Sequence, residues 1–132
     1  MGMLSKVFGA KRARVEPYGL WDDDAAQLAA LEARGADLSA PRESEFFLSF
    51  AAQARADAAV EELRTERIRH ELVEPSHDIP EWMVFVRGTA PLVPDLLRER
   101  VDLCERIAEK HRGDYEGWAG LLTEVERDKI VD

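Results

Sequence analysis

Few side chains in this sequence could support metal-ion or acid–base chemistry. His77 and Asp78 are adjacent, and Glu71 and Glu74 precede them closely. Imidazole and carboxylate groups are ligands that zinc accepts, but this spacing matches no zinc-binding pattern. We therefore interpret these four residues as exposed polar groups of a turn, and we predict no metal site and no bound cofactor.

The remaining candidates for catalysis are weak as well. The three histidines fall on different predicted elements: His70 on a strand, His77 in a turn and His111 at a helix end. Cys104 falls on the apolar stripe of a predicted helix, where a buried, inert thiol is expected. The chain has no glycine-rich phosphate loop and no serine nucleophile turn. The sequence therefore predicts a protein that is not an enzyme and has no catalytic residues.

An aromatic and acidic stretch near the end of the chain carries more information. The segment GDYEGW (113–118) follows a helical pattern that ends in basic residues. Basic residues in a last turn and a left-handed glycine after it are typical of a helix end. A strand is predicted from Tyr115 to Leu122, and its alternation places Tyr115 and Trp118 on opposite faces. One of them would then border the uncovered face of a sheet; alternatively, both are packing residues.

A second aromatic group is predicted on the same uncovered face. Phe47 on one strand would lie beside Trp82 or Phe85 on another. We predict a protein-binding surface formed by Phe47, Trp82, Phe85, Asp114, Tyr115, Glu116 and Trp118. The alternative is that the first helix, or a second copy of the chain in a homodimer, covers these aromatic side chains as ordinary core.

The charge distribution argues against nucleic acid as a direct ligand. The 132-residue chain has a formal net charge of −9, but residues 1–14 hold four basic residues and no acidic one. Removing those four charges leaves −13 on the rest of the chain, which repels phosphate and attracts basic surfaces. The single cysteine fits a reducing compartment, and no apolar run is long enough to cross a membrane. We expect a cytoplasmic protein without membrane contact.

Hydrophobic periodicity predicts seven elements in one domain. A first helix begins at Asp22 and ends at Gly35, and a strand at 44–50 and a helix to about 65 follow it. Strands at 68–72 and 82–87 come next, and a helix that ends near 112 precedes the final strand. In the strand at 44–50, Leu48 faces the core and Ser49 the solvent. Two interleaved βαβ units of this order predict an α+β, ferredoxin-like split βαβ fold: a four-stranded antiparallel sheet with two helices on one face and an extra N-terminal helix. We expect a basic tail at 1–20, the domain at 21–123 and a charged tail at 124–132.

Three segments carry a resemblance to a known family. They are GADLSAPRESEFFLSF (35–50), EWMVFV (81–86) and IAEKHRGDYEGWAG (107–120). Together they resemble the bacterial RraB family, regulators of ribonuclease E, over residues from about 24 to 122. The resemblance implies a ferredoxin-like fold and a non-catalytic inhibitor that binds the scaffold region of ribonuclease E and so modulates RNA turnover. This chain differs in its basic N-terminus and in lacking a long acidic C-terminal extension; the alternative function is a structural dimerisation module with another protein partner.

Overall fold

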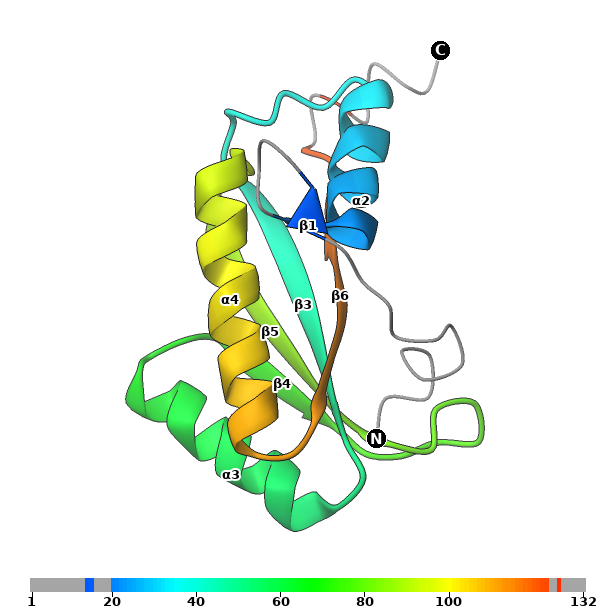
Figure 1. Ribbon diagram of the computed structural model, residues 1–132, viewed down its shortest axis with the longest axis vertical. Helices are drawn as coiled ribbons and strands as arrows, with labels where there is room; N and C mark the ends of the chain where they lie inside the picture. The colour runs from blue at the N-terminus through cyan, green and yellow to red at the C-terminus, as the bar shows by residue number, and fades with distance from the viewer. Residues whose placement is uncertain (1–13, 16–19, 124–125, 127–132) are drawn as a thin grey trace.

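The centre of the protein is a four-stranded antiparallel sheet (Figure 1). The computed structural model describes residues 14–15, 20–123 and 126. The strands lie in the order β4-β5-β3-β6, and every neighbouring pair is antiparallel. Their bounds are β3 Arg42–Phe50, β4 His70–Val73, β5 Trp82–Ala90 and β6 Asp114–Gly120. The predicted four-stranded antiparallel sheet is confirmed.

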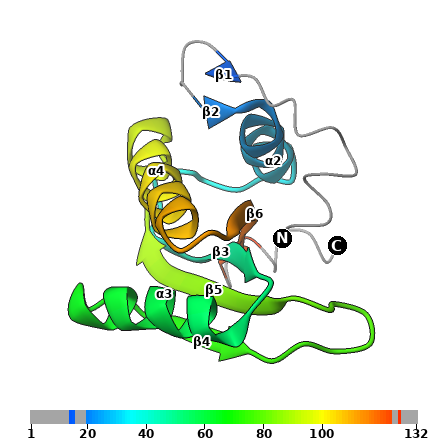
Figure 2. The same ribbon diagram turned by 60° about the horizontal axis from the view of Figure 1, so that its bottom comes forward.

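Three helices with described bounds accompany the sheet. α3 (Gln53–Thr65) and α4 (Pro94–Lys110) pack on one face of the sheet, and α2 (Asp22–Ala33) packs beside β6 (Figure 2). α4 buries an apolar stripe at helical spacing, comprising Leu97, Val101, Cys104, Ile107 and Ala108. α3 approaches the sheet closely because small side chains face it, among them Ala56 and Ala59, which are fully buried. The core therefore lies between the helices and one face of the sheet.

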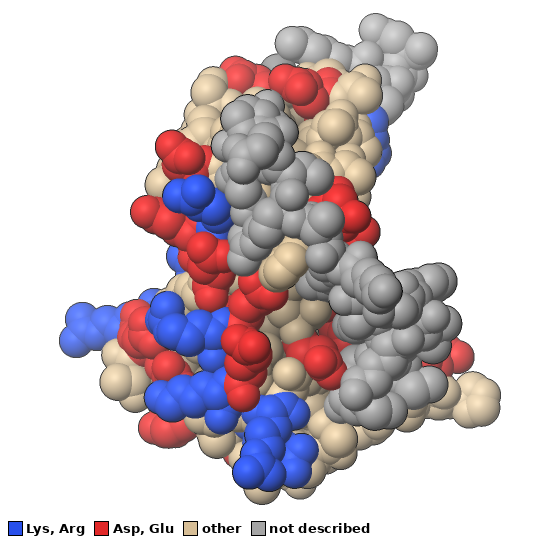
Figure 3. Space-filling view, viewed as in Figure 1, with Lys and Arg blue, Asp and Glu red and all other residues tan. Residues whose placement is uncertain are grey.

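The exposed sides of α3 and α4 carry both signs of charge. In the view of Figure 3, acidic and basic side chains alternate over these two helices. An ionic contact also links the helices, because Glu62 of α3 lies 2.8 Å from the ring of His111 and 3.2 Å from the amine of Lys110. The His111 contact, followed by that of Lys110, lowers the pKa of the Glu62 carboxyl. The net negative charge is therefore not spread as a uniform acidic surface over these helices.

Only part of the two expected tails lies within the described residues. β1 (Arg14–Val15) and β2 (Leu20–Trp21) form a separate two-stranded sheet, and Leu20 is fully buried. The other residues of the expected N-terminal tail, 1–13 and 16–19, fall outside the described residues, as do 124–125 and 127–132 of the C-terminal tail. Glu126 is described, and it is buried rather than solvated.

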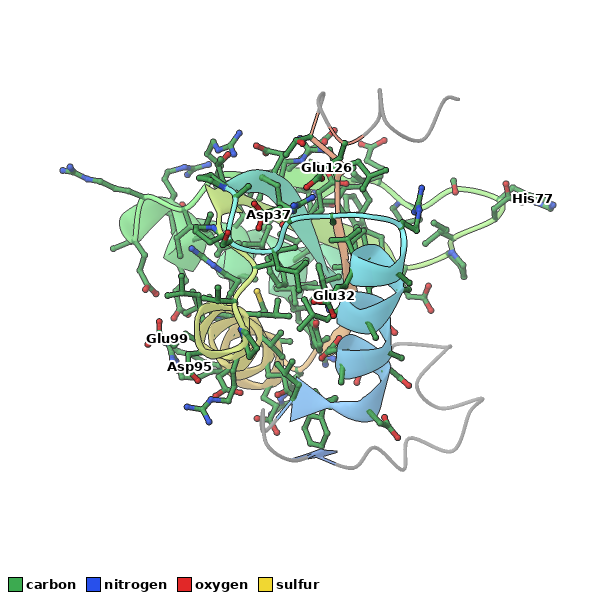
Figure 4. All side chains as sticks on the ribbon, turned by 90° about the horizontal axis from the view of Figure 1, so that it is seen from above. Glu32, Asp37, His77, Asp95, Glu99 and Glu126 are labelled. Atoms are coloured by element: carbon green, nitrogen blue, oxygen red, sulfur yellow. The ribbon has the colours of Figure 1, made fainter. Side chains whose placement is uncertain are left out.

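Glu126 forms a buried ion pair with Arg42 at the start of β3. The two guanidinium nitrogens of Arg42 lie 2.6 and 2.8 Å from the two carboxylate oxygens of Glu126. Arg42 also donates to the carbonyl oxygens of Asp37 and Leu121, and Glu126 accepts from the backbone amides of Asp37 and Thr123. Figure 4 shows Glu126 and Asp37 side by side. This network joins the segment 37–42 to the segment 121–126, and the sequence pattern did not reveal it.

The turn between α4 and β6 differs from the expectation. Gly113 was expected to take the left-handed conformation, but that conformation belongs to Arg112, whose φ is 59°. Gly113 is needed for space instead: a Cβ there would lie 2.4 Å from the Phe50 ring and from the carbonyl oxygen of Ser49. The backbone of this turn therefore packs directly on the end of β3.

Candidate functional site

An aromatic pair marks the sheet face opposite to the helices. Phe47 of β3 and Phe85 of β5 are directly paired across the two strands. Their ring centroids are 5.4 Å apart with an interplanar angle of 78°, an edge-to-face arrangement, and both side chains are only half-buried. No described helix lies on this face, which we call the open face. The predicted neighbourhood of Phe47 and Phe85 is confirmed.

Ion pairs border the aromatic pair on one side. Arg87 lies 2.7 Å from Glu45 of β3 and 2.7 Å from Glu71 of β4, so that it bridges two carboxylates across three strands. The contact with Glu45 is the main cause that raises the pKa of Arg87. Further along the same strands, Glu43 accepts from the Thr89 hydroxyl and from Arg69, and these bonds lower the pKa of Glu43. The two arginines are therefore engaged by carboxylates of the open face.

Trp82, the alternative partner for Phe47, lies on the other side of the sheet. It is paired with Phe50, whose side chain is fully buried among the helices. Trp82 is half-buried and packs against the same core. It therefore does not share the open face with Phe47 and Phe85.

Tyr115 and Trp118 do not point to opposite faces of β6, as the alternation predicted. Phe47 pairs with Gly117 and the next residue, Leu48, pairs with Tyr115, so Glu116 is an extra residue in the strand. Such a β-bulge shifts the alternation by one, and Gly117 supports it with a φ of 134°. Both aromatic side chains therefore lie on the helix side of the sheet.

These two aromatic residues are buried in the folded protein and expose little surface. Tyr115 and Trp118 are each 5% exposed. The Tyr115 hydroxyl donates to the buried carboxylate of Asp24 at 3.0 Å, which anchors α2 to β6. The Trp118 ring stacks on Phe46 with centroids 6.3 Å apart. Both side chains therefore pack in the core, as the alternative interpretation expected.

The two acidic residues of β6 lie nearer to the surface. Asp114 and Glu116 are partly exposed, and Asp114 is paired with Ser49 at the end of the strand. The hydroxyl of Ser49 donates to the Glu116 carboxylate at 2.5 Å. Ser49 was expected to be exposed, but it is 1% exposed because this contact and its neighbours enclose it. The bulge thus turns Glu116 toward the open face, and the glycine at 117 was the only signal of it in the sequence.

A family comparison places this chain among known proteins. The family model described as "Regulator of ribonuclease activity B", RraB, matches residues 21–119, which are 99 of the 132 residues. The chain belongs to the RraB family. The match begins in β2 and ends in β6, so it includes the open face and the bulged strand. The resemblance noted in the sequence is confirmed, whereas no curated protein matches the chain.

RraB is by its description a family of regulators. The side chains that were considered for metal binding or catalysis lie in different parts of this structure. His77 and Asp78 lie in an exposed loop between β4 and β5, and Glu71 is engaged by Arg87. Cys104 is fully buried in α4, and burial raises the pKa of its thiol to about 12. Within the described residues, no three His, Cys, Asp or Glu side chains gather as a metal-binding cluster.

None of the described helices is both long enough and apolar enough to cross a membrane.

Proposed function

We propose that this protein inhibits a ribonuclease E-type endoribonuclease by binding its non-catalytic scaffold region, and so slows RNA turnover in the cytoplasm. The observation that carries the proposal is the match to the RraB family over residues 21–119. In this account the protein acts as a binding partner, without a cofactor and without cleaving RNA itself.

The strand order supports a ferredoxin-like fold for the domain that does this. A strand, a helix, two strands, a helix and a strand follow one another from β3 to β6, and the sheet order is β4-β5-β3-β6. This is the arrangement expected of two interleaved βαβ units. We assign residues 21–123 to this domain, with α2 as an addition that precedes the first βαβ unit.

We place the contact with the nuclease on the open face. Half-buried aromatic side chains surrounded by polar groups are typical of the residues that supply most of the binding free energy at a protein interface. The Phe47–Phe85 pair has this setting, with carboxylates of Glu43, Glu45 and Glu71 on one side and Glu116 on the other. The aromatic pair would therefore supply affinity.

The charges of the open face indicate the chemistry of the partner segment. Four carboxylates (Glu43, Glu45, Glu71, Glu116) accompany two guanidinium groups (Arg69, Arg87), and both guanidinium groups are already paired. The three carboxylates Glu43, Glu45 and Glu71 outnumber the two guanidinium groups that they contact, and this excess would attract a basic segment and speed its association. Asp114 and Glu116 of β6 are further proposed contact residues. Trp82, Tyr115 and Trp118, which lie on the helix side, have no part in this contact surface.

Binding to immobilised fragments of the nuclease tests this proposal. The protein should bind the scaffold fragment and not the catalytic domain, and the affinity should fall as salt rises because exposed charges are screened beyond about 8 Å at physiological ionic strength. Phe47→Ala should weaken binding by about 30-fold, the effect of a typical interface hot spot. Ile79→Ala, which removes a 46% exposed apolar side chain from the loop after β4, is the matched control and should bind normally.

Two results would argue against this mechanism. Binding that is unchanged in Phe47→Ala, with folding verified by urea unfolding, would remove the aromatic pair from the interface. A dimer that persists on dilution and protects Phe47 and Phe85 would show that the open face pairs two copies of the chain instead. Measuring the mass in solution over a range of concentrations separates these outcomes.

A further inference from the structure

A pocket on the helix side of the sheet has no place in the proposed contact with a nuclease. It has a volume of about 280 Å³ and lies between the first half of α4 and the paired ends of β3 and β5. Its wall is mainly apolar, and the lining residues that matter here are Ser44, Phe46, Leu92, Leu96, Arg100 and Leu103. Pockets of this size that combine apolar walls with a few converging polar groups are typical of small-molecule sites.

Two polar atoms in this wall lack a hydrogen-bond partner. The hydroxyl oxygen of Ser44 and one terminal nitrogen of Arg100 are buried and make no hydrogen bond. Ser44 as a whole is 4% exposed, so solvent does not satisfy its hydroxyl. Buried polar groups in native proteins are nearly always hydrogen-bonded, so each of these two atoms is available to a hydrogen-bonding partner. Both residues line the same pocket.

Arg100 also differs from the other enclosed arginines, because it has no counter-ion within the described part of the chain. Arg42 binds both oxygens of Glu126, and Arg87 contacts Glu45 and Glu71. Among the residues that the structure describes, no carboxylate lies within ion-pair distance of Arg100. The backbone leaves room for its head group, since a Cβ on Gly88 would meet nothing nearer than the other terminal nitrogen of Arg100, at 3.9 Å. A guanidinium group in this setting is suited to bind an oxyanion from solution.

We propose that this pocket binds a small monocarboxylic acid with an apolar chain. The carboxylate would accept hydrogen bonds from Arg100 and Ser44, while the chain packs against Phe46, Leu92 and Leu103. Glu99 also lines the pocket and projects from the side of α4 that lies away from α2 (Figure 4). Its negative charge disfavours a second carboxylate or a phosphate, which restricts the ligand to a single negative charge. This proposal does not depend on a ribonuclease as partner.

Titration of the 15N-labelled protein with 4-methylpentanoate tests the proposal, and 4-methylpentanamide is the uncharged control. With eight heavy atoms the acid should bind with a Kd of about 1 mM. The backbone amide signals of Gly88, Thr89 and Ala90 should shift in a saturable way, because these residues line the pocket. The amide should bind about 10-fold or more weakly, since it cannot form the charge-assisted bonds.

Variants of α4 separate the pocket from general charge effects. Arg100→Gln should weaken binding of the acid about 10-fold or more. Arg98→Gln removes an exposed arginine from the same helix and should leave the affinity unchanged. Two results with the wild-type protein would overturn the proposal: no saturable shifts at an acid concentration tenfold above the expected Kd, or equal affinity for acid and amide. Equal affinity of the Arg100→Gln and wild-type proteins for the acid would overturn it as well. Because the ligand comparison uses the wild-type protein, it decides the question even if Arg100→Gln fails to fold.

Discussion

The buried pair of Arg42 and Glu126 gives the most quantitative prediction for the fold. The two side chains are 1% and 6% exposed. Replacing Arg42 by Met keeps much of the side-chain volume but leaves the Glu126 carboxylate with only the amides of Asp37 and Thr123 as partners. Breaking a buried ion pair by removing one partner costs about 3–5 kcal/mol of unfolding free energy. We expect that loss for Arg42→Met.

Urea unfolding of four variants provides the assay. Arg42→Met and Glu126→Leu are measured singly and together, and the double variant should lose less than the sum of the two, because it leaves no unpaired buried charge. The matched control is Arg69→Met, which removes an arginine that is 60% exposed and paired with Glu43. Such surface pairs contribute about 0.2–1 kcal/mol. Equal losses for Arg42→Met and Arg69→Met would refute the reasoning.

The same pair predicts how stability depends on pH. The contact with Arg42, followed by the backbone amides, lowers the pKa of Glu126 well below its usual range. A carboxyl with a lowered pKa in the folded state stabilises the protein above its unfolded pKa of about 4.3 and loses that contribution as the pH falls further. The difference in stability between wild type and Glu126→Gln should therefore be constant near neutrality and shrink below about pH 4. A difference that grows on acidification would contradict the assignment.

Three further predictions concern packing. Leu48→Ala should cost about 2–5 kcal/mol of unfolding free energy because Leu48 is fully buried, and Ser49→Ala about 1–3 kcal/mol because Ser49 donates to a carboxylate. Urea unfolding measures both, and an unchanged stability of Ser49→Ala would contradict the enclosed position of Ser49. Cys104 should resist thiol reagents at pH 8 until the protein unfolds, because its thiol is buried with a pKa of about 12; rapid labelling of the folded protein would be inconsistent with that burial. Gly113→Ala should lower stability by about 1–3 kcal/mol through the clash with Phe50, and an unchanged unfolding midpoint would show that the turn is not so tightly packed.

The periodic parts of the chain were predictable from the sequence. Alternation of Phe46, Leu48 and Phe50 identified the buried face of β3, and the apolar stripe of α4 identified the helix that covers it. These patterns repeat over many residues, so a single exception does not obscure them. They also placed Phe47 and Phe85 together, because the topology makes their strands neighbours.

The errors arose where one residue breaks a local pattern. The extra residue at Glu116 shifts the alternation in β6, and this shift turned Trp118 from a proposed contact residue into core. The pairing of Arg42 with Glu126 joins residues 84 positions apart, and no periodicity connects them. Gly113 was expected to provide a left-handed backbone conformation, but it is needed because a side chain there would clash with Phe50 and Ser49. Sequence composition alone cannot distinguish a buried ion pair such as Arg42–Glu126 from charged residues that are exposed to solvent.

Ribonuclease activity in the presence of this protein tests the central claim most directly. The rate of RNA cleavage is measured for the full-length ribonuclease E-type enzyme and for its catalytic domain alone, each with increasing amounts of the protein. The account predicts that cleavage by the full-length enzyme slows to a plateau at stoichiometric protein, that Phe47→Ala inhibits less, and that the catalytic domain alone is unaffected. Equal inhibition of both enzymes, or no inhibition of the full-length enzyme, would contradict it.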